Sequence, residues 1–207
     1  FAAVSMVGGN LMAFRQTNIK RMLAYSSIAQ AGYMMTAMVA TNAAGIKAVL
    51  FYAMVYVFAN VGAFVTVSYL EMKRGGADFT SVRGLAKDSL LPAGILMVAL
   101  LTMAGIPPTA GFVGKIYIFS AAIDAGYFWL AGVGFVMSMM SVYYYLLVIK
   151  EMFRDVEEGA KWTAEHLSLP LPASAMGVIA VAFTLIIGVW AEPLSIFSNV
   201  AVYTFMR

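Results

Sequence analysis

Long apolar stretches separated by short polar ones make up almost the whole chain. Several of these stretches exceed the roughly 20 residues that a helix needs to cross about 30 Å of hydrocarbon. They are too long for the strands of a barrel, and an open sheet edge cannot be satisfied in lipid. The pattern therefore predicts an all-α fold, a polytopic bundle of about six transmembrane helices.

The apolar stretches also fix where the predicted helices lie. They cover residues 1–14, 19–41, 45–70, 90–125, 127–149 and 171–190. The first is too short to cross a bilayer, and no charged leader precedes it, so we expect this chain to be the C-terminal portion of a longer protein. Residues 193–206 mix apolar and hydroxyl side chains, which favours a helix lying at the membrane interface.

Basic residues alternate between the two predicted membrane faces. One face carries Arg15, Lys20, Arg21, Lys73, Arg74, Arg83, Lys87, Lys150, Arg154 and Lys161, and the other carries Lys47 and Arg207. Loops rich in lysine and arginine stay in the cytoplasm, so we expect the C-terminus on the outer side of a membrane, in bacteria the plasma (inner) membrane. The bases adjoin apolar stretches, so they indicate orientation in the lipid bilayer and no nucleic-acid partner.

Composition removes several kinds of chemistry. The chain is 62% hydrophobic and 11% charged, and it contains no cysteine and one histidine. Disulfides, thiolate metal sites and thiol nucleophiles are therefore excluded, and we expect no metal site of the chain's own. The loop at 151–168 carries five carboxylates and Trp162. It is either a solvated loop or a docking surface for another subunit.

The segment 90–125 is too long for one straight membrane helix. Its 36 residues would extend about 54 Å. Gly105, Pro107 and Pro108 stand in its middle, and consecutive prolines remove backbone donors and disfavour a helical residue before them. We therefore predict a broken helix, which in membranes often marks an ion pathway. The alternative is a kink that serves packing alone.

Lys115 follows the predicted break. It lies eleven residues before Gly126, about 16 Å from the far membrane face. A lysine at this depth costs about 2.5–3.5 kcal/mol, and the chain has no carboxylate at the same depth to offset that cost. Burial disfavours the charged form of an amine, so Lys115 is a candidate proton relay. The alternative is a side chain that extends to the interface, and about 16 Å exceeds its reach.

Polar side chains fall on single faces of three predicted helices. The candidates for a hydrated proton path are Tyr52, Tyr56 and Asn60, then Ser26, Gln30 and Tyr33, then Ser138, Ser141 and Tyr145. Hydroxyls and amides both donate and accept hydrogen bonds, so together with water these groups could lead to Lys115. The alternative is that they only hold membrane helices together.

Three motifs give a family resemblance. RQTNIKRMLAYSSIAQAGY at 15–33, AGIPPTAGFVGKIY at 104–117 and YYYL at 143–146 closely resemble antiporter-like subunit N, or chain 2, of NADH:quinone oxidoreductase (respiratory complex I). The resemblance implies two inverted five-helix repeats, of which residues 1–150 hold the second with its first helix incomplete. Residues 151–207 then form a cytoplasmic-side loop, the last transmembrane helix and an interfacial tail.

The resemblance also implies a function. Lys115 becomes the proton-relay residue of the second broken helix, and Gln30 stands where many subunit-N chains have histidine. The chain is then a non-redox, proton-translocating part of an enzyme complex, with flavin mononucleotide (FMN), iron–sulfur clusters and quinone in partner subunits of its membrane and peripheral arms. Two alternatives stay open: an Mrp-type or membrane-hydrogenase-linked cation/proton antiporter subunit, and a purely structural membrane subunit.

Overall fold

The computed structural model describes residues 1–156 and 168–205, and helices form the regular structure throughout these ranges. They are α1 (Ala2–Phe14), α2 (Ile19–Met38), α3 (Ala43–Arg74), α4 (Leu85–Asp88), α5 (Leu90–Ala104), α6 (Ala110–Asp124), α7 (Phe128–Phe153), α8 (Leu171–Val189) and α9 (Glu192–Phe205). The prediction of an all-α bundle with a discontinuous helix is confirmed.

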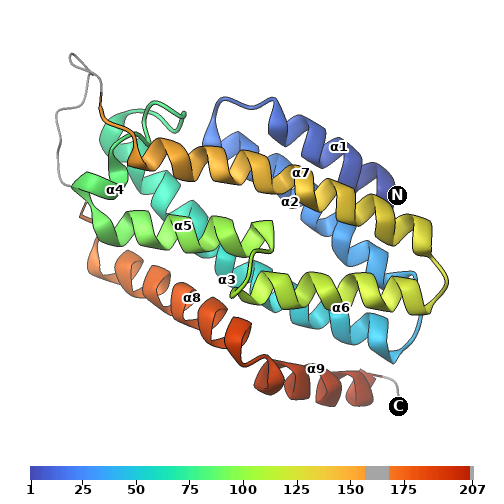
Figure 1. Ribbon diagram of the computed structural model, residues 1–207. Coiled ribbons are helices and arrows are strands. Elements are labelled where there is room, and N and C mark those ends of the chain that lie inside the picture. The colour runs from blue at the N-terminus through green and yellow to red at the C-terminus, as the bar shows by residue number, and fades with distance from the viewer. Residues whose placement is uncertain (157–167, 206–207) are drawn as a thin grey trace.

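Helix α3 occupies the centre of the bundle. It packs against α2, α5, α6, α8 and α9. In Figure 1, α5 and α6 lie end to end in front of α3, with α1, α2 and α7 along one side and α8 with α9 along the other. The loops that follow α1, α3 and α7 lie at one end of the bundle, as the alternation of bases predicts.

Length and composition distinguish the helices. Among the described residues, α3, α7 and α8 are each long and apolar enough to cross a membrane. Helices α5 and α6 have 15 residues each, too few for about 30 Å of hydrocarbon, but placed end to end they extend about 45 Å, which is more than enough to cross it. The polar stripe of α2 lowers its hydropathy, although its 20 residues suffice in length.

Several predicted boundaries differ from the observed ones. Helix α2 ends at Met38, because Thr41 has a φ of +47°, which does not continue a helix. Helix α3 runs one turn beyond its predicted end to Arg74, where two basic residues in the last turn suit the negative helix end. The short helix α4 was not predicted, and the interfacial tail forms α9 from Glu192.

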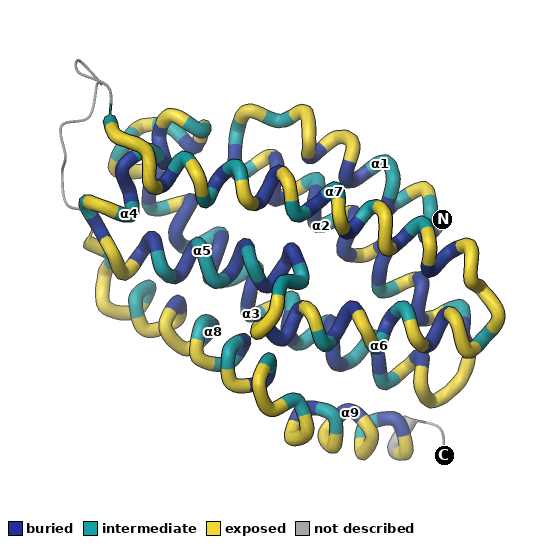
Figure 2. The backbone as a smooth tube through the Cα atoms, viewed as in Figure 1, coloured by how far each residue is buried: buried dark blue, intermediate teal, exposed yellow. Residues whose placement is uncertain are grey.

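The exterior of the bundle is apolar, unlike that of a soluble protein. Figure 2 shows buried positions on the inward faces of the helices and exposed ones around the outside. Exposed positions include large apolar side chains such as Phe128, Trp129 and Trp190, whereas Asn10, Gln30, Lys115 and several hydroxyls are buried. An apolar exterior suits lipid, and interior polar groups then have to bond one another.

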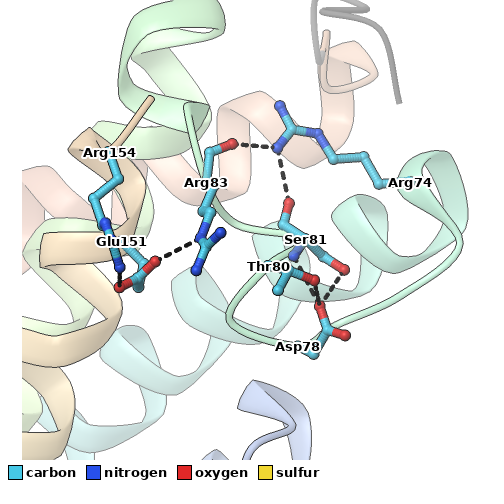
Figure 3. Close-up of polar contacts among 7 residues, drawn as sticks. All are labelled: Arg74, Asp78, Thr80, Ser81, Arg83, Glu151 and Arg154. Atoms are coloured by element: carbon cyan, nitrogen blue, oxygen red, sulfur yellow. Dashed lines mark hydrogen bonds and ion pairs between the residues drawn. The ribbon is translucent and has the colours of Figure 1, made fainter. Parts of the chain in front are cut away.

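Paired charges fasten the loop end of the bundle. The Arg74 guanidinium donates to the carbonyls of Ser81 and Arg83, both at 2.8 Å (Figure 3). It also contacts the Asp88 carboxylate at 3.2 Å. Glu151 at the end of α7 accepts from Arg83 and from Arg154, each at 2.8 Å. The loop between α3 and α5 is thereby tied to both α3 and α7.

Most of the predicted docking loop at 151–168, including Trp162, lies outside the described residues.

Candidate functional site

The broken helix is the centre of the site. Helix α5 ends at Ala104, and its C-cap is Gly105, whose φ of +78° is in the left-handed region that favours glycine. The amides of Gly105 and Ile106 both donate to the Leu101 carbonyl, at 3.0 and 3.1 Å, and Gly105 also donates to Thr102. These are the bonds by which a glycine closes a helix C-terminus. Pro107 and Pro108 follow in the connection, so the break lies where they predict it.

Two other carbonyls at the end of α5 accept side-chain donors from other helices. The Met103 carbonyl accepts from Nε2 of Gln30 on α2 at 3.2 Å. The Ala104 carbonyl accepts from Nζ of Lys115 on α6 at 2.8 Å. With Leu101 and Thr102, this satisfies all four carbonyls that a helix C-terminus leaves open. The negative end of α5 therefore faces the lysine ammonium.

Lys115 is held in the interior by neutral groups. Its Nζ donates to Oγ of Ser138 on α7 at 2.8 Å and lies 5.2 Å from the centre of the Tyr33 ring. Only 5% of the residue is exposed. Because the amine points at the helix break, the geometry does not fit a side chain that extends to the interface. Its hydrogen-bond partners within the described part of the chain are a carbonyl and a hydroxyl, with no carboxylate.

An apolar cavity borders the lysine. Its volume is about 240 Å³, and it lies between α6 and α7. Lys115 and Ser138 line it together with aromatic and aliphatic side chains, among them Phe112, Phe119 and Phe135. The lysine thus has neutral polar partners on one side and an apolar space on the other.

A second polar group surrounds Gln30. Its Oε1 accepts from the Tyr52 hydroxyl on α3 at 2.6 Å, and its Nε2 approaches the Tyr145 hydroxyl on α7 at 3.4 Å. Tyr145 also lies beside Ser26. Gln30, Tyr52, Tyr145 and Ser26 are all buried. One amide therefore joins α2, α3, α5 and α7 next to the break.

Comparison with known proteins identifies the architecture. Residues 1–141 match the family described as NADH:quinone oxidoreductase/Mrp antiporter, transmembrane. The chain belongs to this family. A curated relative in it, NADH-quinone oxidoreductase subunit N of Heliobacterium modesticaldum, is 46% identical over 204 residues, covering 97% of this chain and 42% of the relative. The chain thus spans less than half the length of such relatives.

Solved structures agree with the family. A chain of respiratory complex I from Thermus thermophilus with bound aureothin is 35% identical, has a TM-score of 0.81, and is matched over 94% of this chain and 43% of its own length. A chain of the Mrp complex from Dietzia sp. DQ12-45-1b has a TM-score of 0.85 at 21% identity, over 97% of this chain and 45% of its own. The second likeness shows the shared fold alone.

The structure brings together most, but not all, of the polar residues that the sequence indicates as candidates for a proton path. Ser138 contacts Lys115, and the Ser141 hydroxyl donates to the Ser138 carbonyl at 2.6 Å. Among the described residues, the Tyr56 hydroxyl and Oδ1 of Asn60 are buried and have no hydrogen-bond partner of ordinary geometry. They continue the stripe of Tyr52 toward the loop end, but they lie outside the bonded network.

Sequence analysis missed two buried residues next to the site. Asn10 on α1 donates from Nδ2 to the Tyr33 hydroxyl at 3.1 Å, and its Oδ1 accepts from the Tyr144 hydroxyl at 3.0 Å. Asn10 is 0% exposed. The signal available was a lone amide inside the apolar stretch 1–14. For Tyr144 it was the triple tyrosine, of which Tyr144 and Tyr145 are buried and Tyr143 is exposed.

Proposed function

We propose that this chain provides a proton-relay site of the membrane domain of an NADH:quinone oxidoreductase complex, with Lys115 as the group that accepts and releases the proton. The family match and the subunit-N relatives support the kind of complex. One observation carries the role of Lys115: a buried amine at the break of a membrane helix, bonded to the neutral partners Ala104 and Ser138.

The chemistry of the relay follows from these contacts. A lysine fixed to a carboxylate would keep its proton, whereas one bonded to a carbonyl and a hydroxyl responds to charges that change nearby. Redox energy released in partner subunits would alter such a charge and thereby the proton affinity of Lys115. Water beside the hydroxyls of Tyr52, Tyr145 and Ser26, and at Tyr56 and Asn60, would connect the lysine to the cytoplasmic loops, and Gln30 would hold the two tyrosine hydroxyls in place.

Redox chemistry would belong to the partner subunits. The described residues contain no group of three or more histidine, cysteine or carboxylate side chains that could hold a metal ion. FMN, iron–sulfur clusters and quinone would bind to other membrane and peripheral subunits of the complex. The bases of the loop end would face the cytoplasm of a bacterial cell, and α9 would lie at the outer face.

The test is Lys115→Met in the intact complex, reconstituted in vesicles. NADH oxidation should continue while proton pumping falls, because methionine has a similar length and no exchangeable proton. Lys47→Met is the matched control. Lys47 stands one helical turn before the buried Phe51, and its amine lies over the Tyr117 ring, 5.4 Å from the centroid. Because this contact is separate from the bonds of Lys115 to Ala104 and Ser138, replacing Lys47 should leave pumping near the wild-type value.

Other outcomes would favour the other candidate functions. Normal pumping by an assembled Lys115→Met complex would exclude the relay and leave a structural role for the lysine. Sodium-dependent transport without NADH oxidation would instead indicate a cation/proton antiporter of the Mrp type. Loss of assembly in Lys115→Met, but not in Lys47→Met, would favour the structural subunit.

A further inference from the structure

Asn10 joins three helices beside the lysine. It lies on α1, and its amide contacts Tyr33 of α2 and Tyr144 of α7. All three residues are buried, with exposed fractions of 0% for Asn10 and Tyr33 and 2% for Tyr144. The Tyr33 ring lies against the Lys115 ammonium. The Tyr144 ring is tilted against that of Tyr145, which contacts Gln30, and the two ring centroids are 4.6 Å apart. Asn10 therefore stands between the surroundings of Lys115 and those of Gln30.

The orientation of this amide follows from its contacts. Its nitrogen donates to the Met6 carbonyl at 2.7 Å, and a carbonyl can only accept. The nitrogen must therefore lie on the side of Met6 and Tyr33, and the oxygen on the side of Tyr144. Tyr144 consequently donates to Asn10, and Asn10 donates to Tyr33. Both amide hydrogens and the oxygen are used.

A carboxamide in this position holds hydrogen bonds but does not pass protons. A hydroxyl accepts a proton on the same oxygen from which it releases another. A carboxamide accepts at oxygen and donates at nitrogen, so passing a proton would require its high-energy imidic acid form. Hydrogen bonds therefore run without a gap from Tyr144 through Asn10 to Tyr33, but a proton cannot travel along them past the amide.

We propose that Asn10 is a positioning residue that insulates Lys115, fixing Tyr33 and Tyr144 in place while preventing protons from passing between them. The inference rests on the proposed relay at Lys115. Without such an interruption, protons could move along a row of hydroxyls and bypass the controlled uptake and release at Lys115. These hydroxyls belong to Tyr33, Tyr144 and Tyr145 and to the neighbouring Ser26 and Ser141. Gln30 places a second carboxamide between the Tyr52 and Tyr145 hydroxyls. It likewise holds these two side chains without passing protons directly between them.

The experiment replaces Asn10 in the full-length subunit of the assembled complex, reconstituted in vesicles. Passive proton conductance is measured with a pH-sensitive dye under an imposed potential and without NADH. Asn10→Asp should raise this conductance severalfold, because a protonated carboxyl donates and accepts through its oxygens. Pumping per NADH oxidised should fall correspondingly. Asn10→Leu, which has the same branched shape and cannot carry a proton, should leave passive conductance unchanged.

Two further variants keep the test decisive. If Asn10→Asp does not assemble, Asn10→Ser replaces it, with the same expected increase. Adding Lys115→Met to Asn10→Asp should abolish the extra conductance, because the new route ends at the lysine. Wild-type conductance in Asn10→Asp, or an equal leak in Asn10→Leu, would overturn the inference. If Lys115→Met alone stops pumping in the same preparations, either of these results would contradict the inference about Asn10 and leave the proposed relay at Lys115 intact.

Discussion

The loop end and the helix break of this protein both concentrate polar groups, and they treat charge in opposite ways. At the loop end, Arg74 meets Asp88, and Arg83 and Arg154 meet Glu151. At the break, a single buried ammonium, Lys115, meets a carbonyl and a hydroxyl. Opposite charges in direct contact fix the loops, whereas the isolated charge stays responsive to its surroundings. In the proposed relay, loops held by ion pairs and an interior amine that can change its charge therefore coexist in one bundle.

The largest expected effect tests the break. Gly105→Ala places a Cβ about 2.7 Å from Cδ of Lys115 and forces alanine to the left-handed φ of +78°. The backbone strain costs about 1–2 kcal/mol, and the clash displaces the amine from Ala104, so proton pumping should fall strongly. Gly126→Ala is the control, since Gly126 has a φ of +84° and open space around it. It should lower the melting temperature of the subunit slightly and leave pumping intact, and equal pumping loss in both variants would contradict the assignment.

Arg74→Ala tests the loop end and should have an intermediate effect. The guanidinium side chain is 5% exposed and joins two carbonyls and a carboxylate, so its loss should destabilise the subunit by about 2–3 kcal/mol. Pumping by the molecules that stay folded should be close to normal. Arg154→Ala removes a 53% exposed partner of Glu151 and should cost no more than about 0.5 kcal/mol. Thermal unfolding of the purified complex measures both.

The smallest effect concerns Asp78 in the same loop. Burial alone would raise the pKa of Asp78, but the hydrogen bonds from Ser81 and Thr80 outweigh it, and the pKa is lowered from its ordinary value. A lowered carboxyl pKa stabilises the folded state at neutral pH, and this contribution is lost as the pH falls below about 3.9. Asp78→Ala should cost about 1 kcal/mol or less at pH 7. Melting curves of wild type and variant should converge toward pH 3, and a constant difference would contradict this account.

Much of the architecture follows from the sequence because lipid restricts the choices. Apolar length predicts the helices, alternating bases predict which loops share one end of the bundle, and Pro107 with Pro108 predicts the break. Exact ends were harder to predict. Helix α5 stops at its C-cap, Gly105, ahead of the prolines, because glycine can close the helix in the left-handed region and they cannot.

The contacts of the site depend on the relative rotation of helices, which the sequence does not specify. Ser26, Gln30 and Tyr33 share one face of their helix in the sequence and are all buried, but the bond from Gln30 to Met103 joins residues 73 positions apart. Asn10 was missed because a single amide in an apolar helix has no pattern around it. Tyr56 and Asn60 share the face of Tyr52, yet within residues 1–156 and 168–205 the Tyr52 hydroxyl has a hydrogen-bond partner, whereas the Tyr56 hydroxyl and Oδ1 of Asn60 have none of ordinary geometry.

The bonds of Lys115 have a consequence for the proposed proton relay. An ammonium has three hydrogens, and Ala104 and Ser138 use two of them. A neutral amine keeps two hydrogens and gains a lone pair, so it can retain both partners after giving up the third. The Ala104 carbonyl at the end of α5 therefore keeps its hydrogen bond whether the amine is charged or neutral, and loss of the proton requires no movement of a helix.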